Sequence, residues 1–199
     1  YYGGRVLLGS GNAVTPMQMS SLNGDITFAG TLNSAGVNRS LTLDASNGRI
    51  TFNDQVGNLP TTYGQYLLYG KGPNIAKLDI TARQIIIKAD IQTVDTQTYH
   101  SAILIGDNGS NGFVRTLLSV DPRITFNPLA PIDDMDANKH TLVLGAVSFN
   151  SIVPIIDKPG PVGTNTPLLA FRQFTGRQDE APTAPIGQID SFQPMGTIE

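Results

Sequence analysis

The chain has 199 residues and a mass of 21.2 kDa, which is the length of about one domain. Its net charge is −3, it has no cysteine, and it contains 14 Asp but only 2 Glu and 5 Lys. The lack of cysteine excludes a disulfide scaffold and a cysteine zinc site, and the scarcity of Glu and Lys argues against an all-helical protein. No basic patch and no run of 18 apolar residues is present, so neither nucleic-acid binding nor a membrane-spanning helix is expected.

Short apolar runs separated by Gly, Asn and Asp predict strands along most of the chain up to about residue 150. In most of these runs two apolar residues flank a polar one, which is the pattern of a half-buried strand. No window has the 3.6-residue period of an amphipathic helix, so the expected class is all-β. The predicted strands, in chain order, are centred on residues 26–28, 41–43, 50–52, 78–80, 85–87, 118–120, 124–126 and 142–144.

Self-similarity gives the more specific prediction. The run Asn23–Phe28 recurs as Asn47–Phe52, and Arg49–Asn53 recurs letter for letter as Arg123–Asn127. The sequence separation between the second pair of runs is close to three times the separation between the first pair, so both pairs fit one repeating unit. A unit of this length, about 24 residues, holds three short strands and three turns, as in one coil of a right-handed parallel β-helix. An antiparallel sandwich or barrel is the alternative, because Asn-Gly between strands is also a hairpin signal.

The β-helix interpretation divides the chain into three parts. Residues 21–153 are expected to form roughly six coils. Residues 1–20 are expected to form an N-terminal cap or opening coil, because the end of such a stack exposes strand edges. Residues 154–199 contain seven prolines, which cannot donate to a central ladder, and are predicted to be an extended segment outside the coils. This segment is expected either to cover the flank of the stack or to contact a neighbouring subunit.

Two stretches of the chain resemble a known family. They are GDITFAGTLNSAGVNRSLTLDASNGRITFNDQVG (24–57) and LDITARQIIIKADIQTVDTQTYHSAILIGDNG (78–109), and both are similar to repeats of bacterial exoproteins of the filamentous-haemagglutinin type. The resemblance covers about residues 20–145. It implies a right-handed parallel β-helix, export to the outer surface of a Gram-negative bacterium, and an adhesive or structural role. It supplies no catalytic residues.

The search for reactive groups gives only weak candidates. His100 and His140 stand alone, with no second histidine at metal-binding spacing, and no nucleophile elbow or phosphate loop is present. Asp134 and Asp136 would share one face of a strand, and Asp107 begins a stretch similar to the start of a calcium loop. These three carboxylates are candidates for a cation site, and solvated turns between coils are the competing interpretation. No cofactor is expected.

Aromatic residues are the candidates for self-association or ligand contact. Tyr63, Tyr66 and Tyr69 fit an exposed carbohydrate-binding stripe, a loop packed against the coil, or a subunit contact, and packing or a subunit contact is favoured. The other candidates, all in the proline-rich part of the chain, are Phe171, Phe174 and Phe192. The expected partner is a second copy or a larger parent chain, and a glycan or a host or matrix surface is a further possibility.

The expected function is non-enzymatic. We expect a rigid, exported rod that mediates surface attachment or assembles into a surface layer or filament. One alternative is a glycan-active β-helix, a lyase or hydrolase, which needs carboxylates that converge in a groove, for example Asp90, Asp95 and Asp121 on neighbouring coils. A second alternative is a virion or phage fibre domain, which is also β-helical and poor in cysteine.

Overall fold

The structure is a computed structural model that describes residues 1–9, 16–57, 74–109, 112–120, 123–148, 155–157 and 159–177. The side chains of residues 147, 148, 174, 176 and 177 lie outside this description. Within these ranges the chain forms strands and turns and no helix. The strands are β1 (Val6–Leu8), β2 (Met17–Ser20), β3 (Ile26–Phe28), β4 (Leu32–Ser34), β5 (Arg39–Asp44), β6 (Arg49–Phe52), β7 (Ile75–Thr81), β8 (Gln84–Ile87), β9 (Ile91–Thr93), β10 (Gln97–Tyr99), β11 (Ile103–Ile105), β12 (Val114–Ser119), β13 (Arg123–Phe126), β14 (Ile132–Asp134), β15 (Thr141–Ser148), β16 (Ile155–Ile156) and β17 (Ala170–Arg177).

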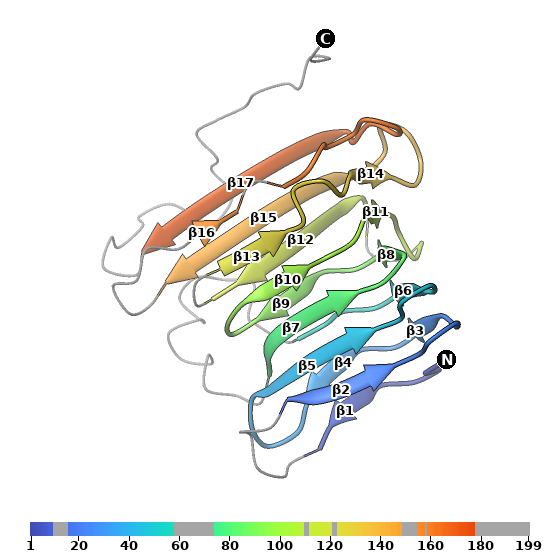
Figure 1. Ribbon diagram of the computed structural model, residues 1–199. Helices are drawn as coiled ribbons and strands as arrows, with labels where there is room; N and C mark the ends of the chain where they lie inside the picture. Colours follow the sequence, from blue (N-terminus) through green and yellow to red (C-terminus); the bar gives the residue numbers. More distant parts are fainter. Residues whose placement is uncertain are drawn as a thin grey trace.

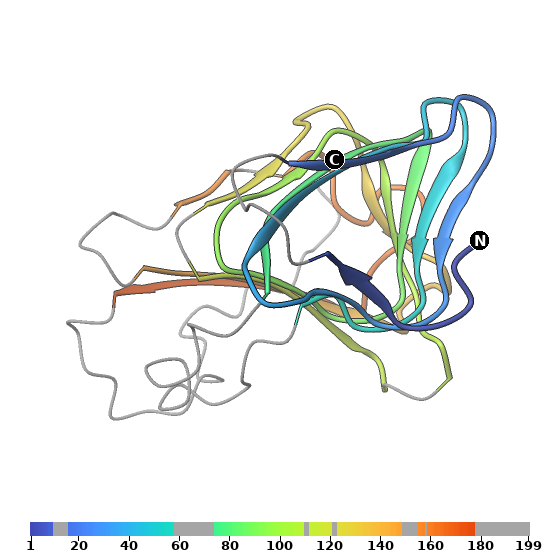
Figure 2. The same cartoon turned by 90° about the horizontal axis from the view of Figure 1, so that it is seen from below.

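The strands lie in sheets on three sides of one interior. The front sheet, nearest the viewer in Figure 1, has the order β16-β13-β10-β7-β5-β2, and the side sheet has the order β14-β11-β8-β6-β3. The back sheet consists of β17-β15-β12-β9 and the pair β1-β4, which are connected by bridges from Val56 to Leu32 and to Ile91. Figure 2, seen from below, shows the sheets around the interior.

The chain passes through the three sheets in a recurring order. It runs from front to side to back in β2-β3-β4, and again in β7-β8-β9, β10-β11-β12 and β13-β14-β15. Every described strand pair is parallel. For the described residues this excludes the antiparallel sandwich, whose neighbouring strands run in opposite directions. The predicted all-β class is confirmed, and the arrangement is compatible with a parallel β-helix.

The first predicted repeat is confirmed by the strand register. Ile26–Phe28 of β3 pairs in register with Ile50–Phe52 of β6. In the turns that precede these strands, the Asn47 Nδ2 atom donates to Asn23 Oδ1 at 3.4 Å. The Asn-Gly turns therefore lie one above the other, and do not close a hairpin.

The second predicted repeat is wrong. The identical runs 49–53 and 123–127 contain β6 and β13, which lie in the side sheet and the front sheet. The reason is the variable length of the connections, which face solvent and tolerate insertions. Stacked residues of the side sheet follow one another at unequal intervals along the chain, in the series Ile26, Ile50, Ile85, Ile103 and Ile132. A whole number of repeat lengths therefore does not lead back to the same sheet.

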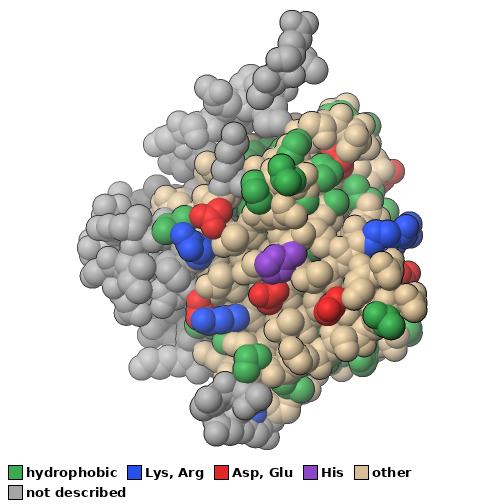
Figure 3. Space-filling model, in the orientation of Figure 1, with side chains coloured by type: hydrophobic (Ala, Val, Ile, Leu, Met, Phe, Trp, Pro, Cys, Tyr) green, Lys and Arg blue, Asp and Glu red, His purple; other side chains and the backbone are tan. Residues whose placement is uncertain are grey.

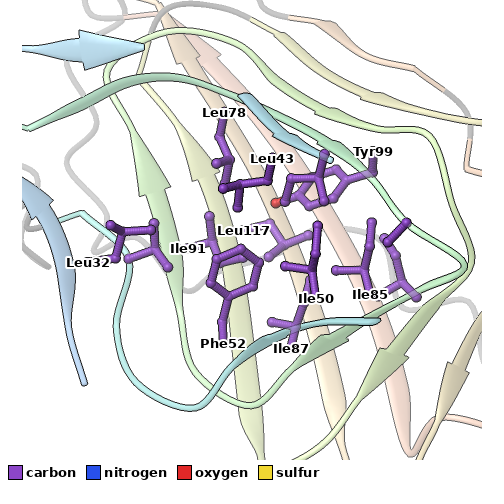
Figure 4. Packing of buried hydrophobic residues seen from close by; sticks show 14 of the residues in the cluster. Leu32, Leu43, Ile50, Phe52, Leu78, Ile85, Ile87, Ile91, Tyr99 and Leu117 are labelled. Carbon is purple, nitrogen blue, oxygen red and sulfur yellow. The ribbon is translucent and has the colours of Figure 1, made fainter. Parts of the chain in front are cut away.

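Alternate side chains of every sheet point into a shared apolar core. Figure 4 shows Leu43 and Leu78 from the front sheet together with Ile50 from the side sheet and Ile91 from the back sheet. Each of these four side chains is at most 1% exposed. Burial of apolar area contributes about 25 cal/mol per Å², so this core is the main source of stability.

Aromatic rings stack along the core. Tyr2 stacks on Phe28 with the ring centroids 5.3 Å apart, and Phe28 stacks on Phe52 at 5.5 Å, with interplanar angles of 10° and 4°. A second pair, Tyr99 and Phe126, has a centroid distance of 5.4 Å. The phenol of Tyr99 is buried and donates to Gln97 Oε1 at 2.8 Å, and burial raises its pKa. Parallel, in-register strands place like residues one above the other, which produces these ladders.

Two strands lie beyond Pro154, where the sequence predicted an extended segment outside the ladders. β16 pairs in parallel with β13, and β17 pairs over its whole length with β15. Both strands are free of proline, and Pro159, Pro161 and Pro167 all lie between them. These three prolines therefore lie in the connection between β16 and β17, where no ladder hydrogen bond is required.

Candidate functional site

The structure brings the three candidate carboxylates, Asp107, Asp134 and Asp136, to one corner of the molecule. Asp107 follows β11, and Asp134 is the last residue of β14. Asp136 lies in the turn between β14 and β15. These residues surround Lys139 and His140, which immediately precede β15. We refer to these five residues as the acid–base cluster.

Asp134 organises the turn in which the cluster lies. Its side chain is 0% exposed and accepts hydrogen bonds from the backbone N–H groups of Asp136 (3.1 Å), Lys139 (3.1 Å) and His140 (2.8 Å). The turn itself requires a left-handed residue, Asn138, at φ 58°. Asparagine adopts this conformation more readily than most residues. The neighbouring Asp133 instead accepts hydrogen bonds from Asn165, so the two adjacent carboxylates have separate partners.

His140 connects two carboxylates in the protein interior. Its side chain is 0% exposed, its Nδ1 lies 2.5 Å from Asp134 Oδ1, and its Nε2 lies 3.0 Å from Asp107 Oδ2. The Phe113 ring packs against the imidazole edge to face, at a centroid distance of 6.0 Å. Both ring nitrogens are therefore engaged by the protein, which leaves neither one available to a substrate.

Lys139 supplies the positive charge on the solvent side of the cluster. Its Nζ atom lies 2.9 Å from Asp107 Oδ2 and 2.9 Å from Asp136 Oδ2, and 5.4 Å from the centroid of the Phe113 ring. The hydrogen bonds from Lys139 and His140 lower the pKa of Asp107, and the hydrogen bonds to Asp136 and Asp107 raise the pKa of Lys139. The ammonium group occupies the place that a cation shared by Asp107 and Asp136 would take. Among the described residues, no group of three His, Asp or Glu side chains is arranged to hold a metal ion.

A buried arginine fixes the loop that carries Asp107. Arg115 of β12 is 0% exposed, and it donates to the carbonyls of Gly106 (2.6 Å), Gly112 (2.8 Å) and Val114 (2.6 Å). Carbonyl acceptors allow a guanidinium group to be buried because they replace its lost water. The loop is thus held by the buried side chains of Arg115 and His140 and, on the solvent side, by Lys139. We therefore interpret the cluster as a structural clamp.

The carboxylates named for glycan chemistry are engaged elsewhere. Asp95 forms an ion pair with Lys77 at 3.3 Å, and Asp90 accepts a hydrogen bond from the Thr116 N–H at 2.8 Å. Asp121 lies outside the described residues. Burial raises the pKa of Asp90, in spite of the hydrogen bond from Thr116 and the charge of Arg115.

The raised pKa of Asp90 gives a pH-dependent prediction. A carboxyl group with a raised folded-state pKa favours the folded state fully below its unfolded pKa of about 3.9, and this contribution is lost as the pH rises through the folded pKa. Asp90→Asn retains the acceptor for Thr116 but cannot ionise. We therefore expect the variant to melt at a higher temperature than the wild type at pH 7, and the difference to vanish near pH 3. Thermal melts of both proteins across this range provide the measurement, and a lower melting temperature at pH 7 would contradict the prediction.

Of the aromatic candidates, only Phe171 has a described side chain. Phe171 lies in β17 opposite Leu142 and packs against the core. Phe174 lies in the same strand, but its side chain is outside the description. Tyr63, Tyr66, Tyr69 and Phe192 also lie outside the described residues. His100 pairs with Asp79 at 3.1 Å on the outer side of the front sheet.

The outer side of the front sheet is a second candidate surface. One row of register partners crosses β2, β5, β7, β10 and β13 and consists of Gln18, Thr42, Asp79, Thr98 and Thr125. Figure 3 shows this side, on which uncharged polar side chains and backbone predominate among the described residues. Polar groups repeat here at the strand spacing of about 4.8 Å. The Asp79 carboxylate interrupts the hydroxyl and amide groups and pairs with His100, and the Thr125 hydroxyl donates to Asp157 Oδ2 at 2.9 Å.

Comparison with known proteins gives no assignment: no family model, no curated protein and no solved structure matches this chain. None of the described residues belongs to a helix long and apolar enough to cross a membrane.

Proposed function

We propose that this chain is a non-enzymatic, exported structural or adhesive protein built as a right-handed parallel β-helix of about six coils. The recurring passage through three sheets, with every described strand pair parallel, is the observation that carries the proposal. Six layers at about 4.8 Å give a rod roughly 30 Å long. The similarity of residues 24–57 and 78–109 to filamentous-haemagglutinin repeats supports location on the outer surface of a Gram-negative bacterium.

The acid–base cluster fits a structural role. Catalysis by a carboxylate and a histidine requires at least one of these groups to face the substrate. Here His140 is fully buried, and both of its ring nitrogens lie against carboxylates. The cluster therefore stabilises a corner of the rod.

The outer side of the front sheet is the proposed adhesive surface. Its row of Gln18, Thr42, Asp79, Thr98 and Thr125 presents short polar side chains on a regular lattice. Sugar hydroxyls are donors and acceptors, and a flat array of hydroxyl and amide groups can bond to several of them at once. A glycan or matrix surface is thus the proposed ligand.

The test measures whether the protein binds a coated surface and whether it degrades the glycan on that surface. Purified protein is applied to beads coated with hyaluronan, pectin or collagen, and both retained protein and released uronides, saturated and unsaturated, are measured. We expect retention on at least one surface without release of product. Thr42→Val combined with Thr98→Val and Thr125→Val should weaken retention at least tenfold. The matched control, Thr27→Val with Thr51→Val on the side sheet, should leave it unchanged.

Two results would contradict this proposal. Release of uronides by the wild type would support the glycan-active alternative. Failure to detect the protein on intact cells of the source organism, by surface proteolysis and peptide mass spectrometry, would contradict export to the outer surface.

A further inference from the structure

We propose that the N-terminal end of the sheet stack binds the C-terminal end of a second copy of this chain, so that copies join head to tail. This inference rests on the proposed structural function, for which it identifies a second copy of the chain as the partner. Three observations support it: the strand edges, the partial burial of the last core layers and the polarity of the sheets.

Each sheet finishes in one edge at the N-terminal end. These edges are Tyr2 for the side sheet, β1 for the back sheet and β2 for the front sheet. Among the described residues, β1 pairs only with β4, and β2 only with β5. The end of the stack therefore presents an edge on all three sides.

The backbone at these edges has hydrogen-bonding groups directed away from the stack. The N–H of Val6 donates to the Thr31 carbonyl at 2.7 Å, and the carbonyl of Leu8 accepts from the N–H of Ala35 at 2.8 Å. Backbone direction alternates along a parallel strand, so the N–H and carbonyl of Leu7, between these two residues, point away from β4. By the same alternation, the N–H of Gln18 in β2 points away from β5. Such groups form a template for another strand.

The core is incompletely covered at this end. Val6, Met17 and Met19 are only partly buried, whereas their register partners Leu32, Leu41 and Leu43 are 0–1% exposed. Further apolar side chains near this end are Tyr1 (84% exposed), Tyr2 (41%), Leu7 (43%) and Leu22 (73%). Apolar groups concentrated in this way, next to strand edges, mark an interaction surface.

The C-terminal end has the same construction. Its last described layer contains β16 in the front sheet, Val162 in the side sheet and β17 in the back sheet. The inward side chains of Ile156, Val162 and Phe171 are partly buried, whereas their partners one layer deeper are at most 1% exposed, namely Ile124, Ile132 and Leu142.

The polarity of the sheets selects a second copy as the partner. Within each sheet all described strands run in the same direction, so placing one copy on another without turning it over keeps every new pair parallel. β17 then faces β1, β16 faces β2, and Val162 faces Tyr2, each within its own sheet. A contact between two different ends does not close on itself and therefore produces a chain of copies.

The edge strands β1 and β2 lack charged side chains, which commonly protect an edge from pairing.

Proline substitutions at the edge provide the test. Leu7→Pro combined with Gln18→Pro removes two N–H groups that point away from the stack and leaves the bonds to β4 and β5 intact. Leu7→Val combined with Gln18→Val is the matched control, because it changes the same side chains and retains the N–H groups. Mass photometry and negative-stain electron microscopy across a dilution series measure assembly, and circular dichroism establishes that all proteins are folded.

We expect the wild type and the valine control to form linear multiples of the 21.2 kDa unit whose length grows with concentration. The proline variant should be monomeric at concentrations at least tenfold higher. A wild type that is monomeric throughout, a wild type that stops at a dimer, or a proline variant that assembles like the control would overturn the inference. Assembly of a wild type that binds no surface would support this inference and contradict adhesion.

Discussion

Phe28→Ala is expected to lower the free energy of unfolding by about 3–5 kcal/mol, the usual range for removal of a buried phenylalanine. Phe28 is 0% exposed and lies between Tyr2 and Phe52 in the aromatic ladder. The substitution removes two ring stacks and leaves a cavity among strands that cannot move independently, because each is bonded to its neighbour above and below. Denaturant unfolding followed by circular dichroism measures the loss.

Tyr2→Ala is the control for this prediction. Tyr2 belongs to the same ladder, but it lies at the end and is 41% exposed. Its replacement removes one stack and creates no enclosed cavity, so we expect a loss of about 1 kcal/mol. Equal losses for the two variants would show that the ladder does not lie inside a packed core.

Asp134→Ala is expected to destabilise the protein by about 3–5 kcal/mol, because each buried group left without its hydrogen-bond partner costs about 1–3 kcal/mol. The change leaves His140 facing an empty space and removes the acceptor for three backbone N–H groups of the turn. Thermal or denaturant unfolding measures the loss of stability. Hydrogen exchange of the amides of Lys139 and His140 should become faster before the rest of the molecule unfolds.

Asp136→Ala tests whether this effect belongs to Asp134. Asp136 lies in the same turn and contacts the same Lys139, but its side chain is 62% exposed. Exposed ion pairs contribute little, so this variant should be nearly as stable as the wild type. A small effect of Asp134→Ala, equal to that of Asp136→Ala, would contradict the assignment of the cluster as a structural clamp.

Several strands could be predicted from the sequence because their pattern is local, but others, such as β1, β4 and β9, were not predicted. The runs Ile26–Phe28 and Ile50–Phe52 show apolar–polar alternation, and both follow an Asn-Gly turn. The sheet to which a later strand belongs could not be predicted in the same way. The copy at residues 123–126 lies in the front sheet because the intervening connections vary in length. Sequence identity between two runs gives no information about that variation.

The candidate site could be predicted only in part. The sequence predicts Asp107, Asp134 and Asp136 as candidates for a cation site, and the structure places them together around Lys139 and His140. His140 was missed as the partner that Asp107 and Asp134 share, since it lies far from Asp107 in the sequence and carries no motif. The contact depends on stacking of the segments after β11 and β14, which is a tertiary feature. Lys139 was missed for the same reason, although its position next to His140 and close after Asp136 is a weak signal.

The most direct test of the parallel stack is disulfide cross-linking, because the natural chain has no cysteine. Thr27→Cys with Thr51→Cys places two thiols on adjacent, in-register strands of the side sheet. Neighbouring strands are about 4.8 Å apart, within the Cα separation that a disulfide allows. Thr51→Cys with Thr125→Cys is the control, because these positions match in sequence but lie in different sheets. We predict rapid intramolecular oxidation of the first pair and none of the second, and the reverse result would contradict the described sheet order.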